Sequence, residues 1–181
     1  MESALRDAAG EPGLKLIETM LWDGARVPRW TLHLARLTAG AAALGWAVPV
    51  VQVEVGAVPA SMPLWRVGLA SERLSSGDPW LGVKSTRRGA YDRARAALAD
   101  GLDEVLFLNE RGEVCDGTIT SVFFDRGAGL RTPPLSCGLL PGVLRAEMAC
   151  PEEVLHGEDL PRVRLWLGNA LRGLSPAVWC G

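Results

Sequence analysis

The chain has 181 residues, 48% of them hydrophobic, which suffices for one substantial core or for two small lobes packed together. The chain has a net charge of −2 and no basic run, which excludes the usual pattern of a nucleic-acid-binding protein. It also has no apolar stretch as long as a membrane span, which excludes the usual pattern of a membrane-spanning protein. Four cysteines without CxxC spacing and only two histidines argue against a structural zinc site, and reduced thiols in a cytoplasmic protein without a signal peptide are the simplest interpretation.

Turn residues divide the chain into short apolar runs. These runs predict strands at residues 14–21, 25–27, 64–70, 80–84, 104–109, 113–124 (interrupted at Gly117) and 162–167, with a last short strand after a loop at 169–176. Helical spacing or a helix-start signal predicts helices at residues 31–45 (with Thr31 as N-cap), 88–99 and 143–150. Residues 50–58 fit either a strand or a shortened helix. Because strands outnumber helices and alternate with them irregularly, we expect a mixed α/β or α+β fold.

The segment Ser75-Ser76-Gly77-Asp78-Pro79 has the composition of a linker, since serine, glycine and proline interrupt regular structure. It predicts a boundary between two lobes. The N-terminal lobe would be a small α/β unit covering residues 1–76, and the C-terminal lobe would be the larger unit, covering residues 77–181.

Lysine is rare in this chain: among 19 lysines and arginines, only Lys15 and Lys84 are lysines. Lys84 stands at the end of the apolar run 80–84. Unlike arginine, lysine can have a strongly lowered pKa, and its neutral amine can form a Schiff base. An ordinary surface lysine is the alternative, and the position alone does not decide between the two.

Two further features complement Lys84. Asp116 lies between an apolar strand and a glycine, where a buried carboxylate would need a cationic partner. The loop at residues 139–145 is a Pro-Gly turn that opens into a helix, whose free N–H groups suit a phosphate. An amine for an aldehyde, a carboxylate for a ring nitrogen and a helix start for a phosphate match the three functional ends of pyridoxal 5′-phosphate. Each feature alone is unspecific, because Asp-Gly is usually a turn and a Pro-Gly helix start is usually a cap.

Six segments of the chain, in order, resemble motifs of the class IV aminotransferases, the fold type IV pyridoxal-phosphate group that includes branched-chain and D-amino-acid aminotransferases and 4-amino-4-deoxychorismate lyase. They are Leu16-Ile17-Glu18-Thr19-Met20, His33-Leu34-Ala35-Arg36-Leu37, Lys84-Ser85-Thr86, residues 112–123, residues 137–145 and Asn169-Ala170-Leu171-Arg172-Gly173. The resemblance spans most of the chain. It implies a two-lobed fold like that of D-amino-acid aminotransferase, with cofactor binding in the lobe of residues 77–181. It also implies a homodimer, because a loop of the partner subunit completes the sites of this family.

The resemblance implies a role for each matched residue. Lys84 would hold the cofactor as a Schiff base and would later move a proton at the substrate Cα. Asp116 would keep the ring nitrogen protonated, which makes the ring an electron sink. Tyr91 would hydrogen-bond the phenolic oxygen of the ring, although its spacing from Lys84 differs from that of several relatives. The phosphate would be bound by Arg36, by the backbone N–H groups of Val143 and Leu144, and by the turn at Asn169 and Ala170.

Arg87 and Arg172 are candidates to bind a substrate carboxylate, because a guanidinium group can bind a carboxylate through two hydrogen bonds. Arg172 belongs to a loop expected to face the cofactor, whereas the pair Arg87-Arg88 is more typical of charges on the surface or at an interface. His33 is interpreted as a surface or packing residue of its helix, and Cys115 as a buried, inert thiol.

Three departures from the family pattern leave a second interpretation open. Asp116 stands where most relatives have glutamate, Ser121 stands where they have asparagine, and the stretches 50–63 and 145–169 are compressed. These features fit a degenerate fold-mate that binds the cofactor weakly or not at all. The retained lysine favours an enzyme, either an aminotransferase or an aminodeoxychorismate lyase, acting on a small amino-acid or aminochorismate-type substrate.

Overall fold

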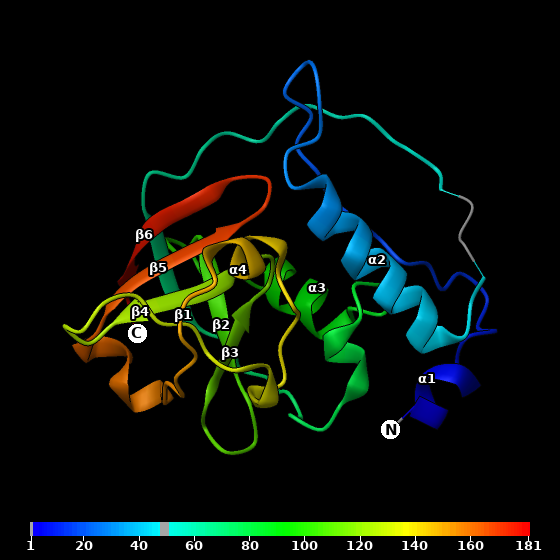
Figure 1. Ribbon diagram of the computed structural model, residues 1–181. Helices are drawn as coiled ribbons and strands as arrows, with labels where there is room; N and C mark the ends of the chain where they lie inside the picture. Colours follow the sequence, from blue (N-terminus) through cyan, green and yellow to red (C-terminus); the bar gives the residue numbers. More distant parts are fainter. Residues whose placement is uncertain (1, 48–50) are drawn as a thin grey trace.

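A single six-stranded sheet forms the centre of the computed structural model, which describes residues 2–47 and 51–181 (Figure 1). The strand order is β3-β2-β1-β6-β5-β4. The strands are β1 (Trp65–Leu69), β2 (Glu104–Leu108), β3 (Val114–Gly117), β4 (Ser121–Asp125), β5 (Arg164–Asn169) and β6 (Gly173–Trp179). Strand β1 runs parallel to both β2 and β6, and the other pairs are antiparallel. The combination of this sheet with helices confirms the predicted mixed class.

The two ends of the sheet lie close together. Strands β3 and β4 are at opposite ends of the strand order, yet only residues 118–120 separate them in sequence. Because an extended chain covers at most about 3.5 Å per residue, this short corner brings the two edges within roughly 14 Å of each other. The sheet is therefore curled until it is nearly closed.

Within the described residues, four helices accompany the sheet: α1 (Glu2–Asp7), α2 (Trp30–Leu44), α3 (Gly89–Ala96) and α4 (Val143–Met148). Short 3₁₀ helices lie at Pro79–Gly82, Leu135–Cys137 and Gly157–Arg162. Helix α2 buries one face, formed by His33, Gly40, Ala41 and Leu44, and it ends at Gly45 in the left-handed conformation (φ 68°). The predicted N-cap at Thr31 is wrong: the helix begins at Trp30, and Arg29 occupies the cap position with φ 62°.

Strand β2 is buried on both faces, which explains its uninterrupted apolar sequence after Glu104. Successive residues of a strand point to opposite faces. Leu106 and Leu108 belong to the main core, which also contains Trp65 and Val122. Phe107 points to the other face and belongs to a second cluster, which also contains Leu74, Cys115, Cys137 and Leu139. The strand therefore separates two cores, as expected of a central strand.

Three predicted strands are absent from the described residues. The run at 14–21 is extended but forms only an isolated bridge between Leu16 and Ser85, and residues 25–27 form no return strand, although the turn at Asp23 is present. The run at 80–84 begins instead as the 3₁₀ helix Pro79–Gly82, because Asp78 caps it by accepting a hydrogen bond from the Trp80 N–H. A proline just after a capping aspartate is a helix-start signal.

Other boundaries differ from the prediction by a few residues. Helix α3 ends at Ala96 rather than near residue 99, α4 ends at Met148, and the predicted loop 169–176 is a tight hairpin turn because β6 begins at Gly173. Residues 51–58 form neither strand nor helix, and Figure 1 shows the chain from residue 51 onwards as an extended segment leading to β1. Residue 50 of that prediction lies outside the described residues.

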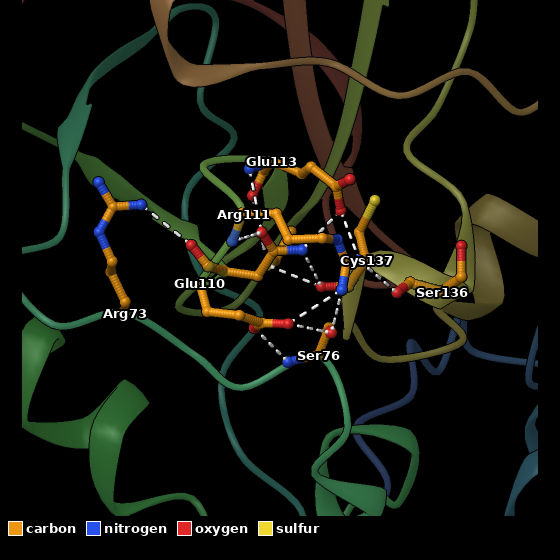
Figure 2. A network of polar contacts seen from close by, with 9 residues as sticks. Arg73, Ser76, Glu110, Arg111, Glu113, Ser136 and Cys137 are labelled. Carbon is orange, nitrogen blue, oxygen red and sulfur yellow. Dashed lines mark hydrogen bonds and ion pairs between the residues drawn. The ribbon is translucent and has the colours of Figure 1, made fainter.

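A polar network fixes the segment around Ser76 against the turn between β2 and β3 (Figure 2). The carboxylate of Glu110 accepts hydrogen bonds from the N–H and the hydroxyl of Ser76, and Arg111 pairs with both Glu110 and Glu113. Arg73 donates to the carbonyl of Asn109.

The predicted division into two lobes between residues 76 and 77 stays a prediction. Strand β1, which precedes this boundary, is hydrogen-bonded between β2 and β6.

Candidate active site

Lys84 is held in place by the N-terminal segment. The N–H of Ile17 donates to the carbonyl of Lys84 at 3.0 Å, and the N–H of Thr86 donates to the carbonyl of Lys15 at 2.8 Å. Together with the bond from the Val83 N–H to the Trp80 carbonyl at 3.1 Å, they fix the backbone on both sides of the lysine. The Lys84 side chain lines a cleft of about 730 Å³. Burial of the amine, followed by the positive charge of Arg36, lowers the pKa of Lys84 to about 8, against the opposing effects of Glu18 and Asp116.

The same cleft collects every residue predicted for the site. They come from α2, from α3 and the segment before it, from β3, from the start of α4, and from the end of β5 and the turn that follows it. The ten residues are Arg36, Lys84, Arg87, Tyr91, Asp116, Val143, Leu144, Asn169, Ala170 and Arg172. Residues far apart in the sequence are thus brought to one cavity, as ligand sites require.

Asp116 is buried on β3 and accepts two hydrogen bonds. The hydroxyl of Tyr91 donates to Oδ1 and the N–H of Leu140 donates to Oδ2, each at 3.2 Å. Burial nevertheless raises the pKa of Asp116 to about 7. The only tyrosine of the chain therefore contacts the carboxylate predicted for the ring nitrogen. Glu113, three residues earlier in the same segment, pairs with Arg111 and Asn109 instead.

The cleft also offers hydrogen-bond donors for an anion. Gly142 precedes α4 without a side-chain cap, so the first N–H groups of the helix, at Val143 and Leu144, lack intrahelical partners. A Cβ on Gly142 would lie 2.3 Å from the Ser121 hydroxyl, so the close approach here requires glycine. Arg36 faces this helix start, because its Nη1 donates to the carbonyl of Pro141 at 3.4 Å.

The turn between β5 and β6 is fixed by one asparagine side chain. The Oδ1 of Asn169 accepts from the N–H groups of Leu171 and Arg172, at 3.0 and 2.9 Å, and its Nδ2 donates to the carbonyl of Ile119 at 3.0 Å. Arg172 follows directly and lines the cleft; its Nε is buried without a hydrogen-bond partner among the described residues. A buried donor without a partner beside a cavity is a candidate to bind a ligand there.

Arg87 and Arg88 differ in their surroundings. The guanidinium of Arg87 pairs with the exposed Glu11 at 3.2 Å and lies 4.7 Å from the centre of the Trp80 ring. Arg88 pairs with Asp92 and donates to the carbonyl of Thr118 at 3.0 Å. Arg87 therefore stands at the rim of the cleft, whereas Arg88 ties α3 to the corner at 118–120.

Sequence reasoning assigned no role to two buried carboxylates. Glu18 contacts both Arg36 and His33, and the fully buried Glu104 accepts hydrogen bonds from the corner residues Thr118, Ile119 and Thr120. A glutamate at the head of an apolar strand was an available signal, since glutamate is almost never fully buried unless it is paired. His33 is 1% exposed, so it is a packing residue and not a surface residue.

The residues present fit pyridoxal phosphate. The amine with a lowered pKa and the buried carboxylate lie in one cleft with the unpaired N–H groups of a helix start. A fold of this mixed type with such a site defines a class of pyridoxal-phosphate proteins. The chain belongs to the amino-transferase class IV family, whose model matches residues 51–178. Class IV aminotransferases depend on pyridoxal phosphate, and the resemblance read from the six segments is thereby confirmed.

Solved structures agree with this assignment. The chain is 38% identical to a candidate amino-acid aminotransferase from Mesorhizobium loti, with a TM-score of 0.80 over 92% of this chain and 100% of that one. It has the fold of 4-amino-4-deoxychorismate lyase from Pseudomonas aeruginosa (18% identity, TM-score 0.77, 91% and 82% of the two chains). It also has the fold of a hypothetical aminotransferase from Mycobacterium tuberculosis bound to α-ketoglutarate and PMP (20% identity, TM-score 0.78, 96% and 84%). No curated protein matches the chain.

These neighbours confirm the predicted class IV aminotransferase fold. None of the helices in residues 2–47 and 51–181 is both long enough and apolar enough to cross a membrane.

Proposed function

We propose that the protein is a pyridoxal-phosphate-dependent enzyme, an aminotransferase or an aminodeoxychorismate lyase, in which Lys84 is the covalent anchor of the cofactor. The observation that carries this proposal is the position of Lys84, with its pKa lowered to about 8, in one cleft with the buried Asp116. When bound, pyridoxal phosphate supplies an electron sink for the charge that develops at the substrate Cα.

Different groups of residues in the cleft have different proposed roles. Arg36, the N–H groups of Val143 and Leu144 and the turn at Asn169 and Ala170 bind the phosphate. Asp116 holds a proton on the ring nitrogen, since a carboxylate beside a cation stabilises the charged form. Tyr91, which already donates to Asp116, orients that carboxylate.

Lys84 is suited to move the proton at the substrate Cα. A general base works best when its pKa lies near the operating pH, and burial brings the lysine into that range. The fixed backbone on both sides of Lys84 limits the positions that the amine can reach.

The cleft favours an anionic substrate. Seven cationic side chains line it against three carboxylates: Arg36, Arg73, Lys84, Arg87, Arg88, Arg93 and Arg172 against Glu72, Asp78 and Asp116. A surplus of one charge in a cleft attracts ligands of the opposite charge. Arg172, with its unpartnered Nε, and Arg87 at the rim are the residues proposed to bind a substrate carboxylate.

A degenerate fold-mate is the alternative, and one observation favours it. The pKa of Asp116 is raised to about 7, so this carboxylate is partly protonated near neutral pH. A protonated aspartate would not stabilise a charged ring nitrogen. The two proposals differ in whether the cofactor is attached to Lys84.

Covalent attachment can be tested directly. The purified protein, incubated with pyridoxal phosphate and reduced with borohydride, is expected to carry one pyridoxyl group on Lys84 by peptide mass spectrometry. Lys15, the other lysine, is exposed and serves as an internal control. Modification of Lys15 alone, or of neither lysine, would favour the degenerate fold-mate.

A homodimer and a cytoplasmic location belong to the same proposal. Large apolar side chains are exposed on and just before α2, where Trp22 is 56% exposed, Trp30 52% and Leu34 45%. Exposed apolar patches on soluble proteins commonly mark interfaces. Sedimentation velocity at micromolar concentration is expected to give a dimer, and a purely monomeric boundary would contradict it.

A further inference from the structure

Glu18 lies between the cleft and helix α2. Its neighbours Ile17 and Thr19 both line the cleft, whereas the Glu18 side chain contacts residues of α2. Alternating residues of an extended segment point to opposite sides, which explains this arrangement. Glu18 is therefore one residue away from the hydrogen bond that fixes Lys84, but its carboxylate is turned away from the cavity.

The carboxylate of Glu18 is fully engaged by two side chains. Its Oε1 and Oε2 accept from the Nε and Nη2 of Arg36, at 2.7 and 2.6 Å, and Oε2 also lies 2.7 Å from the Nδ1 of His33. All three side chains are largely buried: the exposed fraction is 6% for Glu18, 10% for Arg36 and 1% for His33. A planar guanidinium bound at two points has one orientation, so Nη1 remains free to face the start of α4.

The charges in this group act on Lys84. Burial works against ionisation of Glu18, but the hydrogen bonds from His33 and Arg36 keep the pKa of its carboxyl below the ordinary value. Glu18 is thus an anion beside the cation Arg36. The charged groups facing Lys84 are Arg36 from α2, Glu18 from the N-terminal segment, Arg88 before α3 and Asp116 from β3.

We propose that Glu18 is a positioning residue, which orients Arg36 towards the cleft and balances its charge beside Lys84, while His33 holds the Glu18 carboxylate in place. Without Glu18, the full charge of Arg36 would act on the lysine amine. Without Arg36, a buried, unpaired carboxylate would act on it instead. The proposal rests on the proposed function only in taking Lys84 as the reactive amine.

The test uses the cofactor-free protein. The two lysines allow competitive labelling with acetic anhydride across a pH series, in which peptide mass spectrometry follows Lys84 and the exposed Lys15 provides the internal reference. Glu18→Gln is expected to lower the pH midpoint of Lys84 labelling by about one unit, because an uncompensated cation disfavours the protonated amine. Arg36→Ala is expected to raise the midpoint by about one unit for the converse reason. The double variant should return it towards the wild-type value.

Two further variants separate this role from a merely structural one. Glu18→Asp keeps the charge and is expected to leave the midpoint closer to wild type than Glu18→Gln does. Glu113→Gln neutralises another carboxylate that is bound to an arginine, but one that does not line the cleft. It should lower stability without moving the Lys84 midpoint. A Glu18→Gln variant that is destabilised but labels like wild type would overturn the proposal.

The outcome does not depend on a single variant or on cofactor binding. If circular dichroism shows Glu18→Gln to be unfolded, Arg36→Ala decides, and an unchanged or lowered midpoint contradicts the proposal. Failure of the wild-type protein to attach pyridoxal phosphate would contradict the proposed function, yet the opposite shifts of the two variants would still establish the role of Glu18.

Discussion

Replacing Lys84 by arginine is expected to lower kcat by about 10³-fold while the cofactor still binds. Arginine stays protonated at any accessible pH, so it can neither attach the cofactor nor accept a proton. Arg36 and the start of α4, which are proposed to bind the phosphate, are unchanged in this variant, so non-covalent binding should be preserved. The measurement is the single-turnover conversion of bound cofactor by a panel of L- and D-amino acids, followed by absorbance.

Lys15→Arg is the matched control for Lys84→Arg. Lys15 is exposed and contacts the lysine segment only through its backbone, so its replacement should leave the rate unchanged. A Lys84→Arg variant within tenfold of the wild-type rate would show that another group moves the proton. Loss of cofactor affinity together with activity would instead mean that the covalent bond dominates binding.

Replacing Asp116 by asparagine is expected to lower kcat by about 10²- to 10³-fold, because a neutral amide cannot stabilise a charged ring nitrogen. The same change should stabilise the cofactor-free protein in a pH-dependent manner. The folded-state pKa of Asp116, about 7, lies above its unfolded value, so its favourable contribution is complete below about pH 4 and is lost as pH rises to 7. At pH 8 the ionised, buried carboxylate destabilises the fold.

Thermal unfolding of the cofactor-free protein measures this effect. Asp116→Asn should unfold near the wild-type temperature at pH 4. At pH 8 it should be more stable than the wild type by roughly 2 kcal/mol. This figure already includes the loss of one hydrogen bond, because the amide cannot accept from both Tyr91 and Leu140. Asp116→Glu, which keeps the carboxylate, should keep activity. An asparagine variant with full activity would remove Asp116 from the mechanism.

The residues that the sequence grouped into one site line a common cleft, whereas several elements around them differ from the prediction. The motif residues could be grouped because each matched a family segment, and they do share one cleft. The strand predicted at 80–84 is wrong because the capping of Pro79–Gly82 by Asp78 outweighs an apolar run of four residues. The alternating valines at 51–55 form no strand because a strand needs a hydrogen-bonding partner, and none of the described segments pairs with them.

The buried carboxylates were missed for a related reason. Glu18 and Glu104 acquire their roles from partners 14 to 18 residues away in sequence, and no local pattern encodes such pairs. The sequence contained the glutamates, but only the folded chain brings Arg36, His33 and the corner residues to them. Matches to family segments therefore predict which residues line the cleft, and tertiary contacts decide which residues hold them there.

The short corner between β3 and β4 also bears on how copies of the chain can associate. Unpaired edge strands are where sheets of separate molecules join, and such joining leads to aggregation. Here both edge strands are buried along their whole length, and residues 118–120 draw them together. Extension of the sheet by a second copy is blocked at both ends. Association must therefore use side-chain surfaces, such as the exposed face of α2. Copies of the chain can then assemble without the strand-to-strand pairing that leads to aggregation.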